Sequence, residues 1–114
     1  MTNTRYEQLE QGRTVLANRY TDKPLIKLAG ERSVYIGRAG RHGMKQSPWH
    51  NPYRVPQDAA TNEEAVEKYR DYLLAKPELL SRLGELRGKL LVCWCYPNSC
   101  HGNVLIELLE RYQK

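Results

Sequence analysis

Two hydrophobic periods alternate along the chain, and they predict a mixture of strands and helices. Short apolar runs predict strands at 14–18 and 33–37, and a third follows the turn at Gly88. Apolar residues at helical spacing predict a helix over 62–75 and a last helix that begins near residue 100. We therefore expect an α/β fold in which the last helix covers one face of a short sheet.

The pattern around the predicted helices gives their boundaries. Thr61 and Glu64 form a capping box, in which the Thr61 hydroxyl accepts from the amide of Glu64 and the Glu64 carboxylate reaches back. Pro77 fits the first turn of a further helix, and Gly88 follows its end. The inward faces of these two helices are predicted to hold Ala65, Val66, Tyr69, Tyr72 and Leu73, and Leu79, Leu80, Leu83 and Leu86.

Two segments lack a regular hydrophobic pattern. Asp22-Lys23-Pro24 predicts a turn between the first two strands. Residues 39–60 contain glycines and prolines without periodicity, which predicts a long irregular loop. Loops of more than about 15 residues are uncommon in small domains and are usually functional.

The length of 114 residues corresponds to one domain with a modest hydrophobic core. We assign a flexible N-terminal segment to 1–13 and a single α/β domain to 14–114, with a short mixed or parallel sheet flanked by helices. The site is expected at the strand-to-helix turn 93–102, because ligands of α/β proteins bind at the carboxyl ends of strands.

Charge is distributed unevenly along the chain. The net charge is +5, and residues 1–60 contain ten Lys and Arg against five Asp and Glu, whereas residues 61–114 contain eight of each. No acidic residue occurs between Arg32 and Gln57. A basic loop of this kind suits an anionic small molecule, a nucleotide or nucleic acid, although a solvated basic surface has the same composition.

The three cysteines lie within eight positions, an odd number that does not suit a disulfide framework. The N-terminus lacks the apolar core of a secretory signal, and no apolar stretch approaches the roughly 20 residues of a membrane span. We expect a cytoplasmic protein with no membrane partner, whose cysteines are thiols or metal ligands.

The segment 93–102 reads Cys-Trp-Cys-Tyr-Pro-Asn-Ser-Cys-His-Gly and joins a strand to a helix. In one interpretation Cys100 or Cys95 is a reactive thiolate and His101 carries the proton. The unpaired amides at the helix N-terminus would then hold an anion. Cys93 and Trp94 are expected to belong to the core.

Two other interpretations of this segment stay open. Cys93, Cys95, Cys100 and His101 would supply an allowed ligand set for tetrahedral zinc. The spacing is unusual for zinc, however, because adjacent residues at a helix start diverge by about 100° around the axis. Alternatively, the thiols only pack the turn. We expect no cofactor, with zinc as the alternative.

A second group of residues lies at the end of the second strand and in the long loop. Arg38 can present a planar fork to a phosphate or carboxylate. Asn51 precedes a proline, which restricts it to extended geometry, and Tyr53 can stack on a base. With the backbone at Gly37 and Gly102, these residues form the expected site for an anionic substrate.

The chain resembles the small bacterial and phage family known as domain of unknown function 4326. The resemblance covers about residues 14–109 and rests on these segments: 34–38, 51–53, 64–72, 86–89 and the Cys-Trp-Cys-x-Pro-x-x-Cys-His-Gly motif at 93–102. The family usually has Gly-Asn-Pro-Phe at 50–53 and Asp at position 103, where this chain has His-Asn-Pro-Tyr and Asn. The resemblance implies a compact α/β domain and one shared site, but no activity.

These observations lead to one main hypothesis about function. The protein is an enzyme that binds a nucleotide, nucleoside or other anionic small molecule, with Arg38 near Cys95, Cys100 and His101. The alternatives are a nucleic-acid-binding module, stapled by zinc in one version, and a phage or host interaction protein without catalysis. The single-site hypothesis requires Arg38 and Asn51 to lie close to the cysteine turn.

Overall fold

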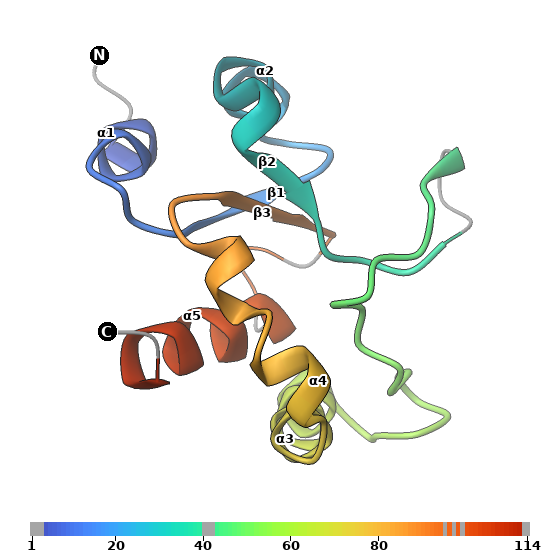
Figure 1. Ribbon diagram of the computed structural model, residues 1–114. Coiled ribbons are helices and arrows are strands. Elements are labelled where there is room, and N and C mark those ends of the chain that lie inside the picture. Colours follow the sequence, from blue (N-terminus) through green and yellow to red (C-terminus); the bar gives the residue numbers. More distant parts are fainter. Residues whose placement is uncertain (1–3, 40–42, 95, 97, 99, 113–114) are drawn as a thin grey trace.

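The computed structural model describes residues 4–39, 43–94, 96, 98 and 100–112. Figure 1 shows three strands in the middle of the molecule with helices above and below them. The elements are α1 (Thr4–Glu10), β1 (Val15–Asn18), α2 (Lys23–Ala29), β2 (Ser33–Tyr35), α3 (Asn62–Leu74), α4 (Pro77–Leu80), β3 (Leu90–Cys93) and α5 (His101–Tyr112). The predicted α/β class is confirmed.

The sheet is wholly parallel and has the strand order β1-β3-β2. Val15 of β1 and Ser33 of β2 both pair with Leu90 of the central strand. Because the three strands run in one direction, their carboxyl ends meet at one edge of the sheet. The end of β1, the start of the long loop after β2 and the cysteine turn after β3 are therefore neighbours.

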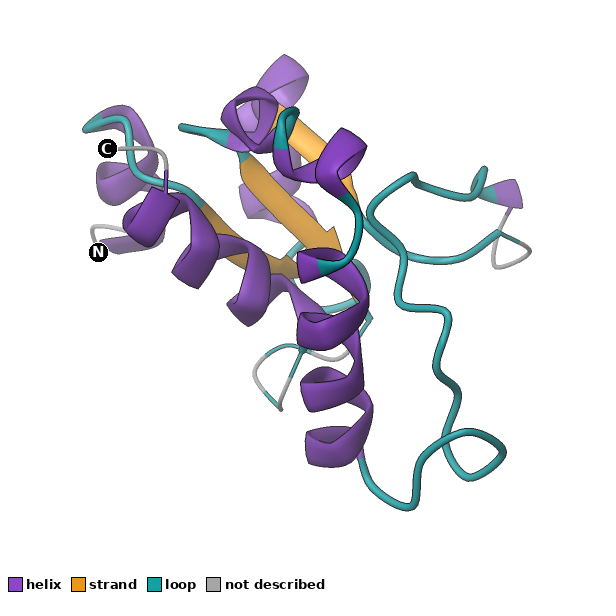
Figure 2. Ribbon diagram, turned by 60° about the horizontal axis from the view of Figure 1, so that its bottom comes forward, coloured by secondary structure: helices purple, strands orange, loops and turns teal. Residues whose placement is uncertain are grey.

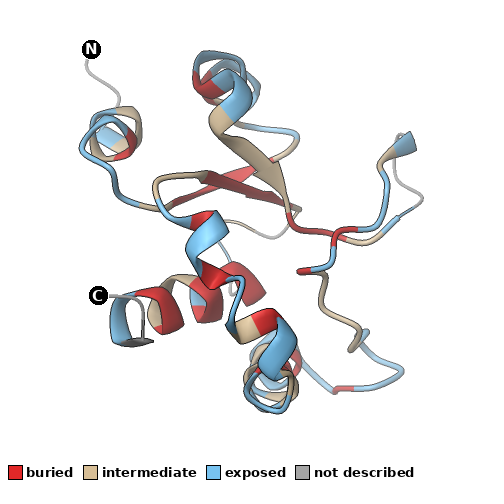
Figure 3. Ribbon diagram, viewed as in Figure 1, coloured by how far each residue is buried: buried red, intermediate tan, exposed pale blue. Residues whose placement is uncertain are grey.

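Helices cover both faces of the sheet, as Figure 2 shows. Alternate residues of a strand point to opposite faces, so the sheet has two separate cores. Val15 and Val92 pack with residues of α1 and α2 on one face. Leu16 and Leu91 pack with α3, α5 and the segment between α4 and β3 on the other. In Figure 3, β1, β3 and the inward sides of the helices are buried, whereas β2 is intermediate.

A helix occupies the place where the sequence predicts a turn before the second strand. Lys23–Ala29 forms α2, with Pro24 in its first turn and Leu25 and Ala29 buried against the sheet. Seven residues are too few for a clear helical period, which explains why the local turn signal dominates the sequence pattern. Parallel strands need a crossover connection, and α2 lies within one.

The N-terminal segment also contains a helix where the sequence analysis expects a flexible stretch over 1–13. Residues 4–10 form α1, and Leu9 is only 2% exposed. The Arg5 guanidinium donates to both carboxylate oxygens of Asp22, at 2.9 and 2.6 Å, and to the carbonyl of Leu16. Asp22 also accepts from the amide of Asn18. These contacts dock α1 beside the end of β1.

The helix pair before β3 follows the sequence pattern more closely. Thr61 accepts from the amide of Glu64 at the start of α3, as predicted, whereas the Glu64 carboxylate accepts from Ala60. The helix expected from Pro77 is divided into α4 and a 3-10 helix over Leu83–Leu86. Throughout the described part of the chain, no helix is long and apolar enough to cross a membrane.

The Arg5–Asp22 contact gives a prediction about stability. Asp22→Ala removes the carboxylate that accepts from the Arg5 guanidinium and from the Asn18 amide, and we expect it to lower the free energy of unfolding by about 1–2 kcal/mol. Urea unfolding followed by circular dichroism measures this change. Glu85→Ala is the matched control, because its ion pair with Arg82 is exposed and its loss should leave the unfolding midpoint unchanged. Equal effects of the two substitutions would contradict the assigned role of Asp22.

Candidate functional site

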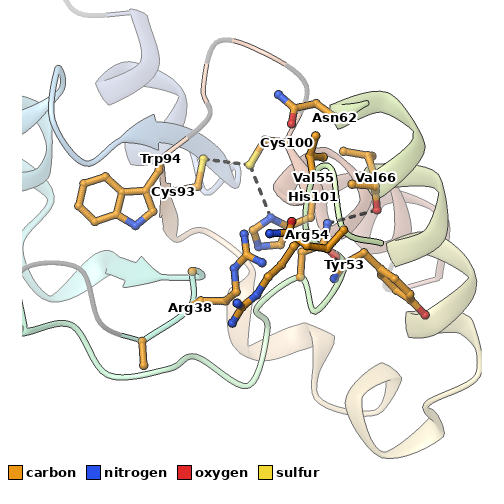
Figure 4. Close-up of a pocket in the computed structure, with 15 residues that line it drawn as sticks. Arg38, Tyr53, Arg54, Val55, Asn62, Val66, Cys93, Trp94, Cys100 and His101 are labelled. Carbon is orange, nitrogen blue, oxygen red and sulfur yellow. Dashed lines mark hydrogen bonds between the residues drawn. The ribbon is translucent and has the colours of Figure 1, made fainter. Parts of the chain in front are cut away.

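A pocket of about 460 Å³ lies at the carboxyl edge of the sheet, between the long loop, α3 and the start of α5 (Figure 4). This volume is in the range of small-molecule sites. None of the described lining residues is acidic. They are Gly37, Arg38, Ala39, Asn51, Tyr53, Arg54, Val55, Gln57, Asn62, Ala65, Val66, Cys93, Trp94, Cys100 and His101.

The structure brings together most of the residues that the sequence predicts for the site. Arg38, Asn51 and Tyr53 line the same pocket as Cys100 and His101, although they come from different segments. The long loop supplies this proximity by returning across the edge of the sheet before α3 begins, as Figure 1 shows. The convergence that the single-site hypothesis requires is present.

For three of the predicted site residues, the structure shows either a packing role or nothing. Cys95 lies outside the described residues. A Cβ atom on Gly102 would stand 2.4 Å from a methyl group of Leu16 and 3.0 Å from one of Ile36, so this glycine lets the start of α5 pack tightly against the core. A Cβ on Gly37 would meet the ring of Tyr35 at 2.4–2.9 Å. Both glycines thus allow close packing, and Gly102 is not among the lining residues.

Cys100 lies immediately before α5 and interacts with its first turn. Its sulfur accepts from the amide of Gly102 at 3.4 Å, which gives the first turn an acceptor for one of its unpaired N–H groups. The amide of Cys100 donates in return to the Asn103 side chain at 3.1 Å. The backbone donor and the positive end of the helix act in favour of the thiolate form of Cys100, against the burial of its sulfur.

His101 is buried at the first position of α5. Its Nε2 atom lies 2.7 Å from the carbonyl oxygen of Ile36. A carbonyl only accepts hydrogen bonds, so in the neutral ring Nε2 carries the proton and Nδ1 has a free lone pair. Nδ1 faces the sulfur of Cys100 at 3.9 Å. The arrangement leaves Nδ1 as the acceptor for the thiol proton.

Burial lowers the pKa of His101 to about 4, from an ordinary value of 6.5. The carbonyls of Ile36 and Trp49 oppose this shift, while the positive charge of Arg38 and the neighbouring His50 reinforce it. Tyr69 packs edge-on against the ring at 4.9 Å between centroids. His101 is therefore neutral at pH 7, a proton acceptor rather than a resident acid.

Cys93 differs from its expected role as a core residue only. It is 1% exposed and belongs to the core cluster, but it also lines the pocket. Its sulfur lies 2.9 Å from that of Cys100. The alternation of strand side chains puts Cys93 on the face of the sheet that α5 covers, which the sequence analysis did not use to pair it with Cys100.

Arg38 presents a buried donor that has no acceptor among the described residues. Its Nη1 atom is shielded from solvent and has no hydrogen-bond partner among the described residues. The backbone at this point is fixed, because Trp94 donates to the Tyr35 hydroxyl at 2.7 Å and that hydroxyl donates to the carbonyl of Arg38. A buried guanidinium nitrogen without an acceptor is unfavourable, so the site is suited to an anion that pairs with it.

Asn51 holds the pocket wall in place through its amide group. The side chain donates to the carbonyl of Ala65 in α3, at 3.2 Å, and accepts from the amide of Tyr53, at 2.9 Å. Nearby, the hydroxyl of the fully buried Tyr69 donates to the carbonyl of Trp49. These contacts hold the long loop against α3. Asn51 therefore positions the pocket wall and also lines the pocket.

Two contributors to the site were not predicted from the sequence. Arg54 lines the pocket, and Figure 4 shows its guanidinium on the same side as the guanidinium of Arg38 and the imidazole of His101. Its position within the acid-free basic stretch is a signal that could have identified it. Asn18, at the end of β1, donates to the carbonyls of Trp94 and Tyr96 and so supports the cysteine turn. No sequence motif marks this role.

The structure describes three of the four predicted zinc ligands, Cys93, Cys100 and His101. The fourth, Cys95, falls outside the part of the chain that the structure describes. Among the residues that are described, no group of three or more His, Cys, Asp or Glu side chains could hold a metal ion.

The fold and the pocket define a small three-layer α/β protein with a thiol and an imidazole at a strand-to-helix turn. Residues 11–111 match the family described as a domain of unknown function (DUF4326), and the chain belongs to that family. A search of the curated proteins and one of the solved structures gave no match.

The low pKa of His101 predicts a pH dependence of stability. Between pH 6.5 and about 4 the unfolded chain binds a proton at His101 that the folded protein does not. The contribution of His101 is therefore fully present above pH 6.5 and is lost as the pH falls towards 4, by up to roughly 3 kcal/mol. Urea unfolding at several pH values tests this prediction. His101→Asn should remove this component of the slope, and identical pH profiles of variant and wild type would contradict it.

Proposed function

We propose that this protein is an enzyme that binds a phosphorylated small molecule of nucleotide size and acts on it with Cys100 and His101. The observation that carries the proposal is the unpaired Nη1 atom of Arg38, which belongs to the same pocket as the thiol and the imidazole. A strong anion site next to a potential nucleophile is the arrangement expected of a group-transfer or hydrolytic enzyme.

The electrostatics of the pocket support an anionic ligand. Arg38 and Arg54 are the charged residues among its described lining, and they have the same sign. A guanidinium binds phosphate or carboxylate through two parallel hydrogen bonds, and these are stronger where water is excluded. The start of α5 adds the positive end of a twelve-residue helix. A phosphate group matches these features.

The remaining walls support a larger organic part of the ligand. Tyr53, Val55 and Val66 provide aromatic and apolar surface, and Gln57 and Asn62 provide amide groups at its border. Amides can pair with the edge of a base or with a ribose hydroxyl, while apolar side chains cover its faces. A nucleoside phosphate matches this combination of apolar walls and amide groups better than inorganic phosphate alone.

The thiol and the imidazole support covalent or base catalysis. Nδ1 of neutral His101 can accept the proton of Cys100, and the amide of Gly102 stabilises the resulting thiolate. The charge of Arg38 lowers the pKa of His101, so an anion that neutralises Arg38 makes His101 a stronger base. Substrate binding would thus promote formation of the thiolate.

Ligand binding tests the anion site. Nucleoside 5′-mono- and diphosphates, sugar phosphates and inorganic phosphate are titrated into the protein by calorimetry. We expect Arg38→Gln to weaken binding of the best ligand at least about tenfold, because a charge-assisted hydrogen bond is lost. Lys27→Gln, at an exposed position of α2, makes the same change in net charge and should leave the affinity unchanged. Equal affinities of Arg38→Gln and wild type would contradict the assignment.

Turnover of the same ligands tests the thiol. Product formation, followed by phosphorus NMR and mass spectrometry, should be lost in Cys100→Ser while ligand affinity stays within about twofold of wild type. Wild-type turnover in this variant would show that Cys100 is not the nucleophile. Absence of small-molecule binding together with tight binding of DNA or RNA would overturn the proposed function as a whole.

A further inference from the structure

Two sulfur atoms lie together at the floor of the pocket. Cys93 ends the central strand and Cys100 precedes α5, and their Sγ atoms are 2.9 Å apart (Figure 4). Both cysteines are 1% exposed. Their only separation along the chain is the turn 94–99, so the strand end and the helix start hold the two sulfurs at close range.

The distance distinguishes two uses of such a pair. Two thiolates that bind zinc tetrahedrally, at about 2.3 Å from the metal, would lie roughly 3.8 Å apart. Two sulfurs in a disulfide are about 2.05 Å apart. The observed 2.9 Å lies about midway between the two values. The sulfurs are thus closer together than two zinc ligands and can form a bond after a small approach.

The surroundings of the two sulfurs differ, and the difference indicates which one reacts first. Cys100 has the amide of Gly102 at 3.4 Å and the free Nδ1 of His101 at 3.9 Å, which favour its thiolate. Cys93 points its thiol towards the carbonyl of Ala17, at 3.7 Å, which favours its protonated form. Cys100 is therefore the attacking thiol and Cys93 the resolving one. Both line the pocket, through which a small reagent can reach them.

We propose that Cys93 and Cys100 form a dithiol–disulfide couple that is oxidised by a low-molecular-weight disulfide. The Cys100 thiolate attacks one sulfur of the reagent, a mixed disulfide forms and one thiolate leaves. Cys93 then attacks the sulfur of Cys100, the internal disulfide forms and the second thiolate leaves. The two protons of the cysteines pass to the two leaving thiolates, with Nδ1 of His101 as the first acceptor. The protein loses two electrons, and the reagent is reduced to two thiols.

This couple goes beyond the proposed function because it rests on the sulfur geometry and needs no anionic ligand. One consequence links the two. In the disulfide form Cys100 is bonded and cannot act as a nucleophile, so oxidation would stop the proposed turnover and reduction would restore it.

The experiment uses full-length Cys95→Ala, in which Cys93 and Cys100 are the two cysteines of the chain. The variant is equilibrated under nitrogen with mixtures of reduced and oxidised glutathione. Remaining thiols are then alkylated, and the mass of the intact protein is measured by mass spectrometry. We expect loss of two hydrogens, no glutathione adduct and no alkylated thiol. The native protein should become half oxidised at a proportion of oxidised glutathione at least about tenfold lower than the same chain in urea, because the fold holds the sulfurs together.

The matched control is Cys93→Ala combined with Cys95→Ala, whose fold is checked by circular dichroism. With no resolving thiol, it should accumulate one glutathione on Cys100. Three results would overturn the proposal. They are two alkylatable thiols in native Cys95→Ala at excess oxidised glutathione, a stable mixed disulfide in that variant, or oxidation no easier in the native protein than in urea. Stoichiometric zinc that protects both thiols would likewise assign the pair to a metal.

Discussion

The hydrogen bond from the Nε2 atom of His101 to the carbonyl of Ile36 fixes the geometry of the whole site. It joins the first residue of α5 to the residue that follows β2, and so ties the helix to the edge of the sheet at the point where the long loop departs. It also determines which nitrogen carries the proton. Without it, the ring could expose either nitrogen to the sulfur of Cys100 and the thiol would have no fixed acceptor.

Burial, and not this bond, explains how a cationic pocket tolerates a histidine. Arg38 and Arg54 line the site, and a protonated His101 would add a third positive charge in a region shielded from water. Burial and the charge of Arg38 keep the ring neutral. An incoming anion would therefore pair with the guanidinium groups and not with the imidazole, whose Nδ1 atom stays available for a proton. In the proposed function, charge recognition and proton transfer are thus assigned to different side chains.

The hydrophobic pattern was sufficient to predict the strands, α3, α5 and the convergence of Arg38 with the cysteine turn, because each depends on a long or strongly apolar segment or on the common edge of a parallel sheet. The helices α1 and α2 were not predicted. Each has seven residues, and each is held by tertiary contacts such as the ion pair of Arg5 with Asp22. Strand alternation places Cys93 on the face that α5 covers, but the close approach of α5 to the sheet at Gly102 is a tertiary feature that the sequence spacing does not show.

The state of the His101 ring tests the central claim most directly. Nitrogen-15 NMR of protein labelled at histidine distinguishes protonated from unprotonated ring nitrogens and follows each of them with pH. The account predicts a neutral ring at pH 7 with the proton on Nε2 and a bare Nδ1, persisting until the pH approaches the pKa of about 4. A ring with its proton on Nδ1, or one protonated on both nitrogens at pH 7, would contradict it.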